Sequence, residues 1–158
     1  VFTKGVRSPK NFMNFFEETE NIEFHWYVND DSKNEIALHN KELNSIFHSI
    51  VDREEALKLM AGSFHCLVSI GNLNTTQIPS KVIEYISTGK PVIHFSEVEN
   101  DPVKNIANEF QNLFIISETS NKENLLNQLN SFYKDISTFN KELFIEKYTS
   151  NSIIEILD

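Results

Sequence analysis

Short apolar runs alternate along the chain with longer segments in which apolar residues recur every three or four positions. The short runs are typical of buried β-strands, and the longer segments have the periodicity of helices that bury one face. Strands that alternate with helices in this way indicate βαβ units. We therefore predict an α/β fold with a three-layer, Rossmann-like, doubly wound sheet of about six mainly parallel strands. The predicted strands are residues 1–3, 22–28, 45–51, 64–70, 91–95 and 113–116.

Capping residues and prolines mark where the helices between these strands are expected to begin. Ser8 and Pro9 are expected to open the first helix, which would bury a stripe formed by Phe12, Phe15 and Phe16. Residues 29–32 have the composition of a turn. The residues expected to cap or open later helices are Asp52, Pro79, Asp101 and Ser120.

Composition excludes several classes of protein. The chain carries 14 basic and 23 acidic side chains, a net charge of −9 at pH 7. Binding to nucleic acid or to an anionic membrane needs clustered Lys and Arg, and the sequence has no such cluster. The lone Cys66 cannot form an internal disulfide, which favours a reducing compartment, so a cytoplasmic location is expected. No apolar run has the roughly 20 residues needed to span a membrane.

The length of 158 residues leaves room for one compact domain. The chain begins with Val1 rather than Met, and its first three residues have the pattern of a strand interior. We expect it to be a fragment whose N-terminal portion is missing.

The segment 69–93 carries the most chemistry. It contains a strand end, a polar loop, a helix start and a second strand. Ser80, Lys81 and Glu84 share one face of the predicted helix, because they are one and four positions apart. Free N–H groups at a helix start attract phosphate, and a carboxylate one turn further on can bind a ribose diol. Spacing alone also allows a solvated Lys–Glu surface pair.

The same residues resemble a known family. The runs 79–85 (PSKVIEY) and 88–93 (TGKPVI), preceded by LVSIGN at 67–72 and by Arg7-Ser8-Pro9 after the first predicted strand, resemble the C-terminal half of GT-B glycosyltransferases. More narrowly, they are similar to the bacterial group-1/family-4-type enzymes that build surface glycans. The order of elements resembles that family over nearly the whole chain, and the specific motif is confined to residues 67–93.

The resemblance implies a donor site for a nucleoside-diphosphate sugar. It places Glu84 on the ribose hydroxyls, and Ser80 and Lys81 at the diphosphate. Gly5 and Arg7 take the positions of a glycine turn and a basic residue beside the same phosphates. The backbone of residues 49–51 would face the base. The complete implied set is Gly5, Arg7, Asn72, Gln77, Ser80, Lys81 and Glu84.

The resemblance also implies what the rest of the protein does. Residues 1–137 would form the nucleotide-sugar-binding domain, and residues 138–158 a helical segment that packs against an absent N-terminal domain. That domain would bind the glycan or lipid-linked acceptor, and could hold the enzyme at the inner face of the membrane. The expected reaction is hexosyl transfer with retention, in surface polysaccharide synthesis, and the fragment alone would be inactive. No catalytic residue is assigned.

Two features concern the donor sugar and metals. Many family members have a glutamate eight residues before the ribose-binding one, and Thr76 stands there in this chain. No Asp-x-Asp triplet occurs, so neither a metal nor another cofactor is predicted. His48, His65 and His94 fall on three different predicted strands, which favours core or strand-face positions over a metal site.

Three alternatives remain open. A nucleotide-sugar epimerase of the same fold would need an acidic, histidine-rich cleft. A non-catalytic nucleotide-binding or assembly module would pair with a separate acceptor-binding subunit. A flavodoxin-like signalling domain would need an acidic pocket at the end of the first strand, where Lys4 and Arg7 stand instead.

Overall fold

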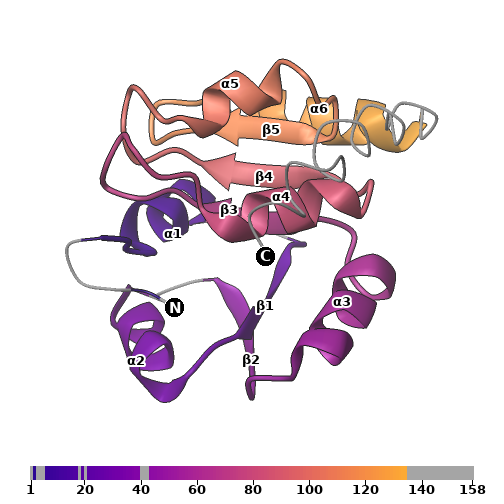
Figure 1. Ribbon diagram of the computed structural model, residues 1–158. Helices are drawn as coiled ribbons and strands as arrows, with labels where there is room; N and C mark the ends of the chain where they lie inside the picture. Colours follow the sequence, from indigo (N-terminus) through magenta and orange to yellow (C-terminus); the bar gives the residue numbers. More distant parts are fainter. Residues whose placement is uncertain (1, 3–5, 18, 20, 40–42, 135–158) are drawn as a thin grey trace, which may run out of the picture.

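The computed structural model describes residues 2, 6–17, 19, 21–39 and 43–134 of the chain. Helices and strands alternate along this part, which confirms the α/β class (Figure 1). Residues 138–158 and most of the first predicted strand, residues 1–3, lie outside the described residues. In chain order the elements are α1 (Lys10–Phe16), β1 (Glu23–Tyr27), α2 (Asp30–His39), β2 (Asn44–His48), α3 (Arg53–Gly62), β3 (Leu67–Ile70), α4 (Ser80–Ser87), β4 (Val92–Phe95), α5 (Val103–Ala107), β5 (Leu113–Ile116) and α6 (Lys122–Lys134).

The strands of the described residues form two parallel sheets instead of one. β1 pairs with β2, and β4 lies between β3 and β5. The prediction of a single sheet of about six strands is therefore wrong for this part of the chain, although the order is compatible with a Rossmann-like fold. In the doubly wound order 3-2-1-4-5-6 the first strand joins the two halves. The segment predicted for that place is described only at Phe2, which belongs to no strand.

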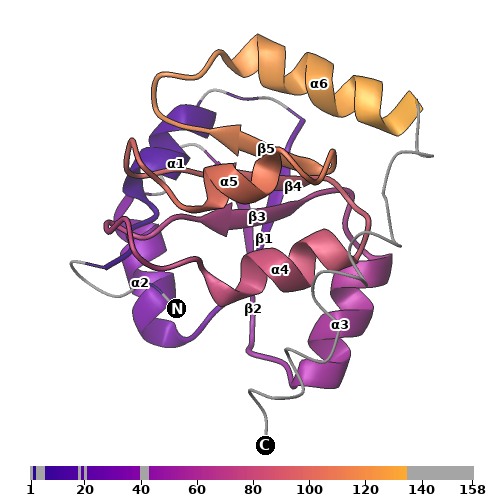
Figure 2. The same cartoon turned by 45° about the horizontal axis from the view of Figure 1, so that its top comes forward.

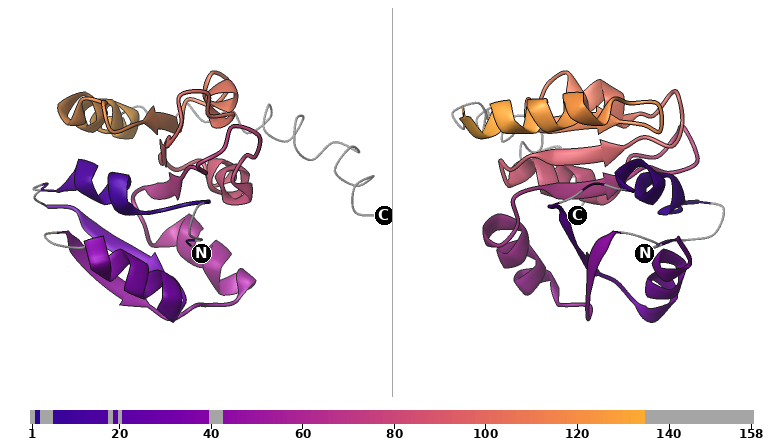
Figure 3. Two further views of the ribbon diagram at one scale, coloured as in Figure 1. Left: turned by 90° about the vertical axis from the view of Figure 1, so that its left-hand side faces the viewer. Right: turned by 180° about the vertical axis from the view of Figure 1, so that it is seen from behind.

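Helices cover both faces of the β3–β4–β5 sheet (Figure 3). On one face, α4 and α5 pack through the buried side chains of Val82, Ile86, Val103 and Ile106. On the other face, α1 and α6 pack in a second cluster that also takes in side chains of β1 and α2. This second cluster joins the two sheets in one core. Three layers were predicted for a single sheet of about six strands, and helices cover both faces of this three-stranded sheet.

The N-terminal helix forms where the phenylalanine spacing predicted it. α1 buries Phe12, Phe15 and Phe16 on one side, as expected from their positions. The Oγ of Ser8 accepts a hydrogen bond from the N–H of Lys10 at 3.3 Å, so Ser8 satisfies an N–H group of the first turn.

The predicted starts of α3, α4 and α5 are confirmed. Asp52 Oδ1 accepts from the N–H of Glu55 at 2.9 Å at the start of α3, and Asp101 Oδ1 accepts from the N–H of Val103 at 2.9 Å at the start of α5. Helix α4 begins directly after Pro79. Its end is followed by Gly89 at φ 72°, a left-handed conformation that favours glycine.

Two local predictions were wrong. Residues 29–32, expected to form a turn, are the start of α2, because Asn29 Oδ1 accepts from the N–H of Ser32 at 3.0 Å and so caps the helix. The cap of α6 is Asn121 instead of Ser120, since Asn121 Oδ1 accepts from the N–H of Asn124 at 2.8 Å. The Oγ of Ser120 instead accepts from the N–H of Ser117. Short polar side chains serve turns and caps equally well, which is why composition did not separate the two uses.

Candidate functional site

The candidate site lies at the carboxyl end of β3, where ligands bind in open α/β sheets. The segment before α1 is held there because the N–H of Leu73 donates to the carbonyl of Val6 at 2.8 Å. Next to this link, the side chain of Arg7 donates to Asn72 Oδ1 through Nε at 3.2 Å and through Nη2 at 2.7 Å. Two predicted site residues, 65 positions apart, are thus in direct contact.

Asn72 is buried and holds this corner together. Its Oδ1 takes the two bonds from Arg7, and its Nδ2 donates to the carbonyl of Gln77 at 3.2 Å. A third predicted residue, Gln77, is therefore tied to the same corner through its backbone, while its side chain is exposed. Thr76 is exposed in the same loop. Gly5 lies outside the described residues.

The guanidinium of Arg7 has no acidic partner in the part of the chain that the structure describes. No carboxylate there lies within 4.0 Å of it, although the side chain is half-buried. Burial lowers the pKa of Arg7, with an opposing effect from nearby Tyr85. A partly desolvated, permanently charged group with free N–H donors is well suited to a phosphate.

Helix α4 presents its polar residues to solvent beside this corner. Val82 and Ile86 are fully buried against the sheet, which leaves Ser80 and Lys81 exposed on the outer face. Within the described residues, no acceptor is bonded to the N–H groups of Ser80 and Lys81. The positive end of α4 is therefore open.

Glu84 has two cationic neighbours and is 36% exposed. Its Oε2 lies 3.4 Å from Lys81 Nζ, and its Oε1 lies 4.0 Å from Arg53 Nη2 at the start of α3. The Lys81–Glu84 contact is the surface pair that spacing alone also predicted. Exposed pairs of this kind contribute about 0–1 kcal/mol. A ligand with a diol or a diphosphate can therefore replace the pair at little cost.

Tyr85 connects the two parts of the site. Burial raises its pKa, the charge of Glu84 raises it further, and the charge of Arg7 lowers it. The effect of Arg7 on this pKa places the guanidinium near Tyr85, and so near helix α4.

Sequence reasoning did not include Arg53 or Tyr85 in the site. Arg53 could have been found from the sequence. Asp52 predicts a helix start after β2, so Arg53, the next residue, is expected near the carboxyl ends of the strands. α3 lies beside α4 (Figure 2), in agreement with the approach of Arg53 to Glu84. No pattern distinguished Tyr85 from the other residues of α4.

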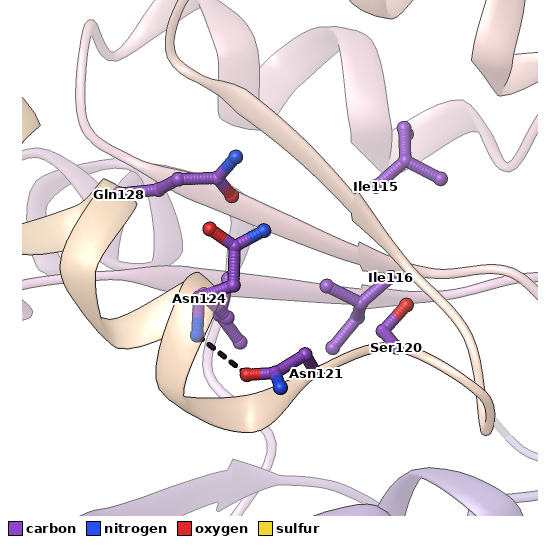
Figure 4. Close-up of a pocket in the computed structure, with 7 residues that line it drawn as sticks. Ile115, Ile116, Ser120, Asn121, Asn124 and Gln128 are labelled. Carbon is purple, nitrogen blue, oxygen red and sulfur yellow. Dashed lines mark hydrogen bonds between the residues drawn. The ribbon is translucent and has the colours of Figure 1, made fainter.

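A pocket of about 250 Å³ lies elsewhere, between the end of β5 and the start of α6 (Figure 4). It contains none of the predicted site residues. Its lining is neutral, with side-chain amides from one face of α6 beside isoleucines of β5, and includes Ile115, Ile116, Asn121, Asn124 and Gln128. This pocket has no charged group with which to bind a phosphate.

Glu97, just after β4, is a partly buried acid beside the site. Its Oε2 accepts from Asn11 Nδ2 at 2.9 Å, while its buried Oε1 has no hydrogen-bond partner. Burial raises the pKa of Glu97, Glu118 adds to the rise, and the bond from Asn11 opposes it. A raised pKa in the folded state means that ionised Glu97 destabilises the fold.

We therefore expect Glu97→Gln to stabilise the protein at neutral pH. The contribution of Glu97 to wild-type stability falls as the pH rises from its unfolded-state pKa through its folded-state pKa, and the variant lacks this pH-dependent contribution. Urea unfolding between pH 4 and pH 8 should show a variant–wild-type difference that grows with pH and then levels off. Glu99→Gln, an exposed change in the same loop, is the control. A pH-independent difference would contradict this account of Glu97.

Two further observations concern metals and membranes. In the described part of the chain, no three His, Cys, Asp or Glu side chains are grouped so that they could hold a metal ion. No helix among the described residues has the length and apolar character required to cross a membrane. Comparisons of the chain with protein-family models, with curated proteins and with solved structures found no match.

Proposed function

We propose that this chain binds the nucleoside-diphosphate sugar of a glycosyltransferase, as the donor half of a GT-B enzyme. The observation that carries the proposal is Arg7, a half-buried guanidinium at the carboxyl edge of the sheet, oriented by Asn72 and without a carboxylate partner among the described residues. The protein is acidic overall, with a net charge of −9. An unneutralised cation in such a protein favours an anionic ligand at this position.

Each part of the donor has a matching group. Arg7, Lys81 and the open start of α4 bind the diphosphate. Glu84 accepts hydrogen bonds from the ribose hydroxyls, in exchange for its exposed contact with Lys81. Residues 49–51 follow β2, next to Arg53, and their backbone faces the base.

In the transfer reaction these cations stabilise the leaving group. Negative charge develops on the nucleoside diphosphate as the bond to the sugar breaks, and Arg7 and Lys81 are placed to offset it. In the proposed enzyme, an N-terminal domain binds the acceptor and activates it. The proposed product is an extended surface glycan, formed on the cytoplasmic side of the membrane.

A thermal-shift panel on the full chain tests the proposal. The ligands are UDP, GDP, CMP, UDP-glucose and GDP-mannose, with inorganic phosphate as the control. At 100 times its dissociation constant, a ligand stabilises the folded state by about 2.7 kcal/mol. We expect at least one nucleoside diphosphate or its sugar to raise the melting temperature well above the effect of phosphate. The absence of any such rise at millimolar ligand would contradict the proposal.

A further inference from the structure

A chain of buried side chains connects β3, β4 and the start of α5. Ser69 and His94 are neighbours in the register of the two strands. The Oγ of Ser69 lies 3.2 Å from His94 Nδ1, and His94 Nε2 lies 2.9 Å from Asp101 Oδ2. Their exposed fractions are 5%, 0% and 4%, so all three are buried and too enclosed for a substrate to contact them. None of these three side chains can therefore react with a substrate, and any role in binding must act through neighbouring residues.

The carboxylate of Asp101 is held in place by hydrogen bonds. Its second oxygen, Oδ1, accepts from the N–H of Val103 at 2.9 Å, so both carboxylate oxygens are bonded. Burial by itself would raise the pKa of Asp101, but the hydrogen bonds from His94 and Val103 and the charge of His94 outweigh it, and the pKa lies below its usual value. The carboxylate can only accept, so His94 donates to it through Nε2.

The carboxyl end of β3 packs directly against the carboxylate of Asp101. A Cβ atom added at Gly71 would lie 2.9 Å from Asp101 Oδ2 and 2.9 Å from the carbonyl oxygen of Phe95. The N–H of Gly71 donates to that same carbonyl at 2.8 Å. Only a residue without a side chain fits this approach. The next residue is Asn72, whose Oδ1 orients Arg7.

We propose that His94 and Asp101 are positioning residues for the phosphate-binding guanidinium, acting through Gly71 and Asn72. They fix the position of the carboxyl end of β3 relative to β4 and α5. They thereby also fix the position of Asn72, which orients Arg7. The inference rests on the proposed function, because it assigns these residues to the same anion site. It differs from a role in stability alone, because it predicts a loss of nucleoside-diphosphate affinity in variants that remain folded.

The first test compares the affinity for UDP and GDP of variants that remain folded, by calorimetry on the full chain. His94→Leu and Asp101→Asn should weaken binding about fivefold or more. His94→Gln should restore most of the affinity, because its amide can donate to Asp101 as Nε2 does. The matched control is Asn112→Ala. Asn112 is equally buried and bonds to the carbonyls of Ile86, in the last turn of α4, and of Lys90, before β4, at the opposite end of both elements from the site. It should lower the melting temperature and leave the affinity unchanged.

A double-mutant cycle supplies the second test and does not depend on the more disruptive Leu variant. If Asp101 acts through Asn72, then Asp101→Asn should weaken UDP or GDP binding in the wild type and have little effect in the Asn72→Ala background. Additive losses of binding free energy would overturn the inference. So would Asp101→Asn and His94→Leu proteins that bind with wild-type affinity.

Failure of the inference differs from failure of the proposed function. If Arg7→Ala weakens UDP or GDP binding and the His94 and Asp101 variants do not, the positioning role alone is wrong. If neither UDP nor GDP binds the wild type, or if Arg7→Ala leaves the affinity unchanged, the anion site itself is wrong and the positioning role falls with it.

Discussion

Replacing Arg7 by Ala is expected to weaken the binding of a nucleoside diphosphate by about 10- to 100-fold, since a hydrogen bond to a charged group contributes about 1.5–3 kcal/mol. The loss should be this large because the guanidinium is half-buried and already oriented by Asn72. Little conformational freedom remains to be lost when the ligand binds. Calorimetric titration of the full chain with UDP and GDP measures the effect.

Two further variants separate the effect of the positive charge of Arg7 from the effect of its hydrogen-bond geometry. Arg7→Lys keeps the charge, but Lys cannot make the paired contact with Asn72, so it should recover only part of the affinity. Lys58→Ala removes a positive charge from an exposed pair with Glu54 on α3, and should leave binding unchanged. If Arg7→Ala and Lys58→Ala cause equal, small losses of affinity, Arg7 contributes only to the overall electrostatic potential of the protein.

Replacing Phe12 by Ala is expected to lower the free energy of unfolding by about 3–5 kcal/mol, the range for large aromatic residues in cores. Phe12 is fully buried and contacts rings from three elements. Its ring centroid lies 4.9 Å from that of Phe16 in α1, 5.6 Å from that of Phe24 in β1 and 5.9 Å from that of Phe95 in β4. The side chain thus joins the two sheets, and its removal leaves a cavity at their junction.

Urea unfolding at pH 7 measures this loss. Leu38→Ala is the control, because Leu38 is 73% exposed on α2 and its truncation should change stability by less than about 0.5 kcal/mol. If Phe12→Ala costs no more than Leu38→Ala, the two sheets do not share the core described here. A separate early transition in Phe12→Ala, confined to α1, β1 and β2, would locate the weakened contact at the junction.

Local periodicity predicted most of the helices and strands, but it did not predict how the strands combine. The spacing of Phe12, Phe15 and Phe16 identified α1 and its buried side. The start of helix α2 was predicted to be a turn, because the helix buries only Ser32 and Ile36 and so has almost no apolar stripe to detect. The division into two sheets depends on hydrogen bonds between strands distant in sequence, and spacing carries no information about them.

The candidate site, too, was only partly predictable from local spacing. Ser80, Lys81 and Glu84 lie on one helix, so their common face followed from spacing. The contact between Arg7 and Asn72 joins residues 65 positions apart, and only the fold brings them together.

The central claim is that a nucleoside diphosphate binds between Arg7 and the start of α4, and a ¹H–¹⁵N NMR titration of the ¹⁵N-labelled full chain with UDP and GDP tests it most directly. The account predicts that the largest shifts occur at the backbone N–H groups of Ser80 and Lys81, which have no acceptor among the described residues, and at the Nε–H of Arg7, which donates to Asn72. Binding that shifts other resonances and leaves these three unchanged would contradict it.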